Sequence, residues 1–463
     1  MSHQDQDGRV RYNAAYLRIA LQWLLGRSLA GIAFREDCTW SPVQLASAAL
    51  LWVWSDELTL GERFVTARKI TALLYQPQRE FGESYQCFLK LLRRWTATLI
   101  APWQRALRDR LREALAKYWE VHGFALFGVD GSRIELPRTK SHEAAYSWIR
   151  PARVRKRSRR KKPRTAAHTM KANTPLMWLT VLWHAGTGLP WAWRIGPTDS
   201  SEREHWREMI PELPENALVA ADAGYVGYEY ARALLDSGGH LLLRVGSSVR
   251  LLRKLGWTKE SESTVYIWPQ HAQPDKPPLV LRLVVGHNGK SPIYLVTSIL
   301  SSRRLTDRQV LDLYRRRWGI ELFFRHLKQT YQRRKLRSER AENARVELEW
   351  SLLGLWGMAL YAQAEIHKHQ GDPTRISIAC VLRSYRRMIR DYRHPAQRGS
   401  TLSSLLQSAL RDQYKRRSKA SRNYPCKKQY DPPPRAPEIL KASATEVLHA
   451  RMLRYVTSKG VTA

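Results

Sequence analysis

Two apolar runs that each end at an aspartate constrain the fold of this 463-residue chain more than any other feature. FALFGVD at 124–130 and ALVAAD at 217–222 lack the alternation of apolar and polar residues that marks a strand with one solvated face. Such runs are typical of strands buried on both faces, as in α/β sheets covered by helices. They predict a central sheet with Asp130 and Asp222 in the carboxyl-side end region of neighbouring strands.

The segments between and after these two runs complete the pattern of an α/β domain. In chain order they are a second short strand candidate, SRIEL, directly after Gly131, a hairpin over 175–196 turned at GTG, a helix over 200–210, a helix over 225–237 and a buried strand over 240–245. Apart from the extra short strand SRIEL, they give with the two runs the order β-β-β-α-β-α-β, which is that of a ribonuclease-H-like core.

A mainly β segment at 246–300 then interrupts this alternation of strands and helices, with strand candidates STVYIWPQ, PPLVLRLVVG and SPIYLVTSI. GHNGKS at 286–291 does not predict a phosphate-binding loop, because Val284 stands where that motif needs its first glycine and no helix follows. Asn288-Gly289 between two strand candidates instead favours a type I′ hairpin turn. After the insertion, 306–329 is predicted to be one long helix.

Helical patterns flank this α/β region on both sides. Ser41-Pro42 is typical of a helix start, and Thr59 to Glu62 matches a capping box. The predicted division is a helical N-terminal domain over 1–119, an α/β domain over 120–335, a helical C-terminal domain over 336–420 and a linker and tail over 421–463. The N-terminal helices are expected to bind DNA, with a supporting role as the alternative, and the C-terminal helices to dimerise.

The charge balance points to a polyanionic partner. Lys and Arg total 78 against 41 acids, a formal net charge of +37, which predicts strong attraction to nucleic acid. A membrane protein is not expected, because the N-terminus is polar and the most apolar stretch, 45–54, is too short to span a bilayer. The four cysteines show no metal-ligand spacing, so we expect a reduced cytoplasmic, nucleoid-associated protein.

The densest basic run lies at 153–164, where nine of twelve residues are Lys or Arg. Such a run repels itself unless it is solvated or neutralised by phosphates. We expect it to bind DNA, with a solvated loop of no specific role as the alternative. The DNA-contacting residues expected here are Arg155, Lys156, Arg157, Arg159, Arg160, Lys161 and Lys162.

The predicted helix at 306–329 carries an unusual polar stripe. Because a helical residue turns by about 100°, four polar residues fall on a stripe roughly 60° wide: Tyr314, Arg317, Glu321 and Lys328. The ordinary interpretation is a solvated charged face, and the alternative is a row of reactive groups. Trp318 is expected to lie in the core.

Asp130 in GVDGS, Asp222 in ADAGY and the Tyr-x2-Arg-x3-Glu-x6-Lys pattern at 314–328 together resemble the DDE transposases of bacterial insertion sequences. The resemblance is to the subgroup with a tyrosine–arginine–glutamate–lysine signature and a β insertion, and it covers roughly 120–335. It implies a ribonuclease-H-like catalytic core with a mainly β insertion at 246–300, flanked by helical N- and C-terminal domains.

The same resemblance implies the roles of the site residues. Asp130, Asp222 and Glu321 would hold two Mg²⁺ ions, with Mn²⁺ as a substitute, and Asp130 would bridge them. Tyr314, Arg317 and Lys328 would hold the terminal phosphates of the transposon end.

The implied function is a DNA transposase that binds the ends of an insertion sequence and catalyses metal-dependent cleavage and strand transfer. Its partners would be the double-stranded DNA of the transposon ends and of the target, and a second copy of the chain in a synaptic homodimer. Two alternatives stay open at this point: a decayed or domesticated DNA-binding protein on the same fold, and a metal-dependent nuclease without strand transfer.

Overall fold

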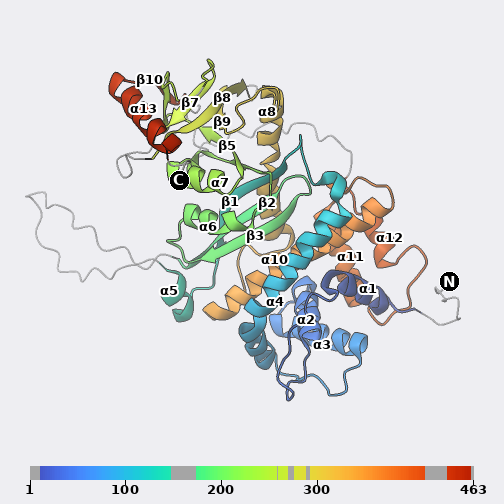
Figure 1. Ribbon diagram of the computed structural model, residues 1–463. Coiled ribbons are helices and arrows are strands. Elements are labelled where there is room, and N and C mark those ends of the chain that lie inside the picture. Colours follow the sequence, from blue (N-terminus) through green and yellow to red (C-terminus); the bar gives the residue numbers. More distant parts are fainter. Residues whose placement is uncertain are drawn as a thin grey trace, which may run out of the picture.

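The computed structural model describes residues 11–147, 174–257, 259–268, 276–287, 292–411 and 435–459. A single sheet of ten strands in the order β10-β6-β7-β8-β9-β5-β4-β1-β2-β3 runs through these residues (Figure 1). Its strands are β1 Ala125–Glu135, β2 Leu176–His184, β3 Leu189–Gly196, β4 Ala217–Ala221, β5 His240–Val245, β6 Arg250–Arg253, β7 Thr264–Ile267, β8 Leu279–His287, β9 Pro292–Thr297 and β10 Glu438–Lys441.

The first five strands follow the chain order predicted for a ribonuclease-H-like core. β1, β2 and β3 are antiparallel neighbours, and β4 and β5 continue the sheet parallel to β1. One expectation here was wrong, because β1 is a single strand where two short strands were predicted around Gly131. The reason is β2, which pairs with β1 without a break from Phe127–His184 to Glu135–Leu176.

The mainly β insertion does not form a separate sheet but extends the core sheet. β9 pairs antiparallel with β5, and β8, β7 and β6 follow outward. Three of these strands were predicted, whereas β6 was missed. The turn predicted at Asn288-Gly289 lies outside the described residues.

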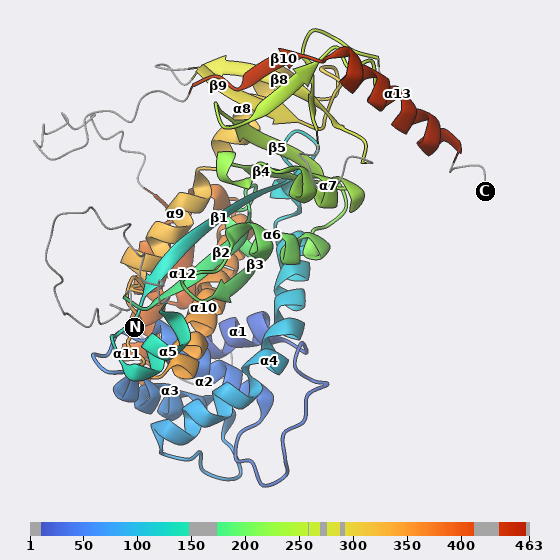
Figure 2. The same cartoon turned by 90° about the vertical axis from the view of Figure 1, so that its left-hand side faces the viewer.

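The C-terminal segment returns to the far edge of this sheet. β10 pairs parallel with β6, and helix α13 (Ala444–Lys459) packs through Ala450 on Leu252 and Tyr266. Figure 2 shows the sheet continuing from the core strands through the insertion to β10, with α13 beyond it. Residues 435–459 are therefore structured, where sequence analysis expected only a linker and tail.

Helices cover both faces of the core strands. On one face lie α6 (Glu202–Met209) and α7 (Tyr228–Asp236), whose Trp206 and Leu234 share a core with strand residues such as Val219. The opposite face is covered by α8 (Asp307–Arg316), α9 (Gly319–Arg325) and α10 (Ala341–Lys368). The core strands are thus buried on both faces, as their unbroken apolar runs predicted.

The remaining helices form one body beside the sheet. They are α1 Asn13–Leu25, α2 Pro42–Trp54, α3 Leu60–Tyr75, α4 Tyr85–Ala114, α5 Lys140–Tyr146, α11 Ile378–Arg390 and α12 Leu402–Gln407. Ser41 and Thr59 close the capping boxes that begin α2 and α3, as predicted. Trp54 Nε1 donates to the carbonyl oxygen of Gly354 at 2.9 Å, so the helices predicted as separate N- and C-terminal domains share one core.

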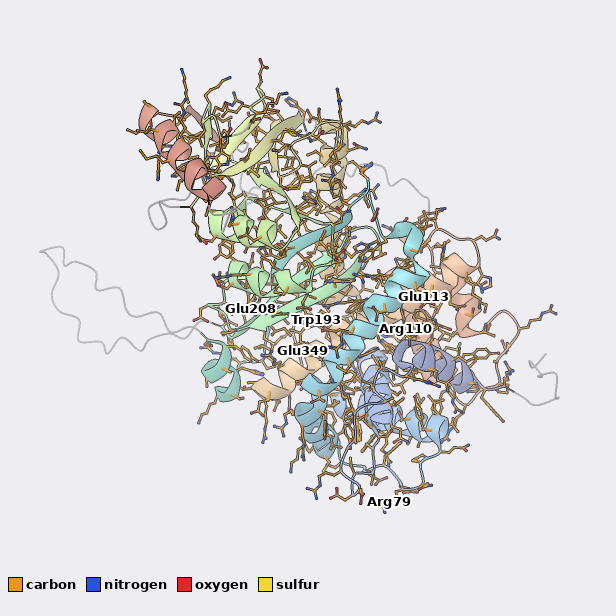
Figure 3. All side chains as sticks on the ribbon, in the orientation of Figure 1. Arg79, Arg110, Glu113, Trp193, Glu208 and Glu349 are labelled. Carbon is orange, nitrogen blue, oxygen red and sulfur yellow. The ribbon has the colours of Figure 1, made fainter. Side chains whose placement is uncertain are left out.

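Helix α10 joins this helical body to the sheet. Trp193 on β3 donates from Nε1 to Glu349 Oε2 on α10 at 2.6 Å, and both side chains are labelled in Figure 3. Burial raises the pKa of Glu349, and the hydrogen bond from Trp193 acts in the opposite direction. The Trp193 N–H thus gives this buried carboxylate a hydrogen-bond donor at the junction. Among the described helices, none has the length and apolar character to cross a membrane.

Candidate active site

Strand pairing places the two predicted aspartates side by side. β1 and β4 are parallel and pair Ala125 with Ala217 through to Gly128 with Ala220. Continuing this register by two residues sets Asp130 beside Asp222, one residue beyond the end of β4. The charge of Asp222 accordingly acts on Asp130 and raises its pKa. The structure therefore brings together the two carboxylates that the apolar runs predicted.

Both aspartates are held by backbone N–H groups close by in the chain. Asp130 Oδ1 accepts from the Gly131 N–H at 2.9 Å, and Asp222 Oδ1 accepts from the Gly224 N–H at 2.8 Å. The pKa of Asp130 is raised to about 6, chiefly by burial and also by the charges of Asp222 and Glu202, while the Gly131 N–H and the charge of Arg317 act in the opposite direction. An excess of negative charge is thus gathered at this point of the sheet.

The helix predicted over 306–329 is broken in the structure, which corrects that expectation. α8 ends at Arg316, α9 begins at Gly319, and a π-helical turn, η4, occupies His326–Thr330. A Cβ atom on Gly319 would lie 2.0 Å from the Trp183 ring of β2. Since only a glycine permits that approach, the break lets α9 pack directly on the sheet.

The break also divides the polar stripe, which the sequence predicted to face outward together. Tyr314 and Arg317 are only 5% and 6% exposed, whereas the Glu321 side chain is 43% exposed. Trp318, predicted to lie in the core, is instead 59% exposed. The physical reason is a tighter turn at the break, where the Arg317 N–H donates to the Tyr314 carbonyl oxygen and the Glu321 N–H to the Trp318 carbonyl oxygen. Such i→i−3 bonds do not keep the 100° progression of one α-helix.

Arg317 links the helical residues to the aspartates. Its guanidinium lies 3.9 Å from the Glu321 carboxylate and 5.5 Å from the centre of the Tyr314 ring. The same charge lowers the pKa of Asp130. Arg317 is therefore a buried cation between the strand carboxylates and the helical carboxylate.

Lys328 approaches the same strand from the π-helical turn. Its Nζ donates to Ser132 Oγ at 2.7 Å, two residues after Asp130 on β1. Burial lowers the pKa of Lys328. The last residue of the predicted signature thus lies next to the first aspartate strand, although η4 separates it from the regular helix.

The fit of these residues to a metal ion is partial. Within the described ranges, no three His, Cys, Asp or Glu side chains form a group that could hold a metal. Asp130 and Asp222 do fit a divalent cation, because they are adjacent hard oxygen donors in a region of excess negative charge. Glu321 lies beside Arg317 and outside this pair.

Three residues near the site were missed by sequence reasoning. The charge of Glu202 raises the pKa of Asp130, and the charges of both aspartates raise the pKa of Tyr225. Ser132 Oγ accepts a hydrogen bond from Lys328 Nζ. Ser132 in GVDGS and Tyr225 in ADAGY lie within the motifs already singled out. Glu202 lies in an ordinary amphipathic helix pattern, which gives no signal of its place. The basic run with Arg155, Lys156, Arg157, Arg159, Arg160, Lys161 and Lys162 lies outside the described residues.

Comparison with known proteins agrees with this geometry. Residues 126–356 match the family described as "Transposase DDE domain". The chain is 27% identical over 259 residues to "Transposase InsG for insertion sequence element IS4" of Escherichia coli K12, covering 53% of this chain and 54% of that protein. It is 24% identical over 147 residues to "Putative transposase for insertion sequence element IS4SA" of Synechocystis sp. PCC 6803, covering 31% of this chain and 40% of that protein.

The chain therefore spans about half the length, or less, of these curated relatives. Among solved structures, a piggyBac transposase synaptic complex with hairpin DNA aligns with 92% of this chain and 91% of that chain, at 12% identity and a TM-score of 0.40. That score is too low to assign a shared fold. The family match includes both aspartate strands and the helices that carry Arg317 and Glu321.

Proposed function

Because this chain belongs to the DDE transposases of bacterial insertion sequences, we propose that it binds the ends of an insertion sequence and catalyses DNA cleavage and strand transfer. The proposed site consists of Asp130, Asp222 and Glu321. The observation that supports it most is the register of β1 and β4, which sets two carboxylates beside each other at one end of a strand pair.

Transposases of this family generally depend on a divalent metal, and we propose Mg²⁺, with Mn²⁺ as a substitute. Asp130 and Asp222 would hold it as adjacent oxygen donors, and Glu321 would complete the ligand set from α9. When bound, the cation would activate the attacking oxygen and stabilise the leaving oxygen of the phosphodiester. The raised pKa of Asp130 supports this, because burial and the neighbouring acids disfavour its charged form and a bound cation would stabilise that form.

Arg317 would offset part of the negative charge of these carboxylates when no cation is bound. Its charge lowers the pKa of Asp130, and its guanidinium lies 3.9 Å from Glu321. The Arg317 guanidinium lies over the Tyr314 ring, 5.5 Å from the ring centre, and the ring stabilises its positive charge. We propose that Tyr314, Arg317 and Lys328 also position phosphates of the transposon end, with Lys328 held at β1 by its hydrogen bond to Ser132.

The partners proposed are double-stranded DNA of the element's ends, target DNA, and a second copy of the chain in a homodimeric complex. An excess of basic residues, 78 against 41 acids, supports a polyanionic partner. With DNA as the substrate, we expect the protein to act at the nucleoid.

The test is a cleavage and joining reaction with the terminal inverted repeats that flank the reading frame and a supercoiled target. We expect Mg²⁺-dependent nicks at the ends of the element and covalent joining of those ends to the target. Nicking without joining would favour a nuclease, and end binding without nicking would favour a decayed DNA-binding protein. Either result would overturn the proposed function.

The basic run is tested by the salt dependence of DNA binding. Changing Arg155, Lys156, Arg157, Arg159, Arg160, Lys161 and Lys162 to Ser should flatten the slope of log affinity against log salt by several units, since each phosphate contact contributes roughly 0.9. Changing only the four arginines to Lys keeps the charge and should keep the slope. An unchanged slope in the Ser variant would exclude the run from the DNA interface.

A further inference from the structure

The first turn of α6 contacts the loops of both aspartates. On one side, a Cβ atom on Gly131 would lie 2.4 Å from Glu202 Oε1, so the carboxylate rests directly on the residue after Asp130. On the other side, Arg203 Nε donates to the carbonyl oxygen of Gly224 at 2.6 Å. The N–H of that same Gly224 holds Asp222. Two consecutive residues of α6 therefore fix the surroundings of both carboxylates.

Tyr225 is buried and interacts with Glu202 and with both aspartates. Its side chain is 3% exposed, and after burial itself the charges of Glu202, Asp130 and Asp222 all raise its pKa. Burial and the charge of Asp222 raise the pKa of Glu202, while the Tyr225 hydroxyl lowers it. These mutual effects place Glu202, Tyr225 and the two aspartates in one electrostatic group.

Glu202 also has an ordinary explanation, as an acid in the first turn of a helix capped by Ser201. Glu204 distinguishes the two roles, because it occupies the same turn and would benefit equally from the helix dipole. Glu204 is exposed and accepts from the Tyr230 hydroxyl at 2.8 Å, away from the aspartates. Glu202 instead points its carboxylate at Gly131, where helix stability does not require it.

We propose that Glu202 is a fourth carboxylate of the active site and acts as a positioning residue for Asp130. It fixes the backbone at Gly131 and the ring of Tyr225, and so sets how tightly Asp130 and Asp222 hold a divalent cation. This inference rests on the proposed function. Outer-shell partners of metal-binding carboxylates commonly affect metal affinity by about 10- to 100-fold.

The test measures Mn²⁺ binding to the full chain by electron paramagnetic resonance, together with nicking of an end-bearing DNA. Glu202→Gln should raise the Mn²⁺ dissociation constant roughly tenfold and raise the Mn²⁺ concentration for half-maximal nicking in parallel. Glu202→Asp should recover part of the affinity, and Glu204→Gln should stay within about twofold of wild type. A Glu202→Gln variant that also stays within twofold would overturn the inference.

A second pair of variants tests the contact itself. Gly131→Ala drives a methyl group into the Glu202 carboxylate, so that side chain must swing away and Mn²⁺ binding should weaken. Gly131→Ala combined with Glu202→Ala should weaken Mn²⁺ binding little beyond Glu202→Ala alone, because both changes remove the same contact. If the two changes weaken Mn²⁺ binding additively, the contact with Gly131 is not how Glu202 acts on Asp130.

Failure of this inference is distinguishable from failure of the proposed function. If Asp130→Asn abolishes Mn²⁺ binding while Glu202→Gln leaves it unchanged, only the role of Glu202 is wrong. If Asp130→Asn leaves Mn²⁺ binding intact, the metal site and the role of Glu202 are both wrong.

Discussion

The two halves of the candidate site are built in different ways. Asp130 and Asp222 stand on paired strands, where the ladder register of β1 and β4 determines their separation. Glu321 and Lys328 stand on α9 and η4, two short helical segments that follow a break after Arg316. The strand half is fixed by backbone hydrogen bonds, whereas the helix half is fixed by side-chain packing on Trp183 and by Arg317.

The strand half of the site is already formed, whereas the helix half has freedom to move. The charge of Asp222 already acts on Asp130, whereas the Glu321 side chain is 43% exposed and lies 3.9 Å from its ion-pair partner Arg317. Pairs of that kind contribute little free energy. The exposed Glu321 side chain therefore has more freedom to move than the two carboxylates at the ends of the paired strands.

The largest effect is expected from removing one proposed metal ligand from each half of the site. Asp222→Asn and Glu321→Gln should each lower the nicking rate by roughly 10³-fold, because a lost metal ligand costs several kcal/mol of transition-state stabilisation. Gel-shift affinity for end DNA should change by less than about threefold, since neither carboxylate contacts phosphate directly. Nicking by Glu321→Gln at the wild-type rate would remove the helix half from the site.

The packing of the helix half is tested by Gly319→Ala. The added Cβ atom would lie 2.0 Å from Trp183, so α9 must move away from β2, at a cost of about 3 kcal/mol in the free energy of unfolding. Gly61→Ala in α3 is the matched control, because the nearest atom is 4.0 Å away and alanine suits a helix better. Urea unfolding of both variants gives the comparison, and equal stabilities would show that α9 does not depend on this contact.

The sequence predicted the strand half well because its signal is local. Seven-residue and six-residue apolar runs ending at Asp130 and Asp222 determine burial, strand type and end position together. The helix half was predicted only as a linear pattern. The break at Arg317 depends on Trp183 of β2 lying against Gly319, a contact between distant segments with no local signal. Glu202 was missed for the same reason, since its role depends on Gly131.

The strand half is tested by the pH dependence of stability in metal-free buffer. The pKa of Asp130 is raised to about 6 from 3.8, so ionising it costs more in the folded state, and stability falls as pH rises from about 4 to 6. Asp130→Asn should therefore stabilise the protein by about 1–2 kcal/mol at pH 7.5. The gain should disappear below pH about 4, where both states are protonated.

Asp37→Asn is the control for this measurement, because the Asp37 side chain is 70% exposed and substitution there should change stability by less than about 0.5 kcal/mol. Thermal unfolding with a chelator at pH 3.5 and 7.5 gives both values. If Asp130→Asn is less stable than wild type at pH 7.5, the ionised Asp130 carboxylate stabilises the folded state, and the prediction is wrong.

In the proposed site, carboxylates from both halves hold the cation and Arg317 does not. The decisive measurement is the Mn²⁺ dissociation constant of the complex with end DNA, obtained by electron paramagnetic resonance. Glu321→Gln should weaken Mn²⁺ binding by at least about tenfold, because it removes a ligand. Arg317→Ala should leave binding unchanged or tighten it, since it removes a positive charge beside Glu321 and Asp130. Equal weakening by both variants, or no weakening by Glu321→Gln, would contradict the account.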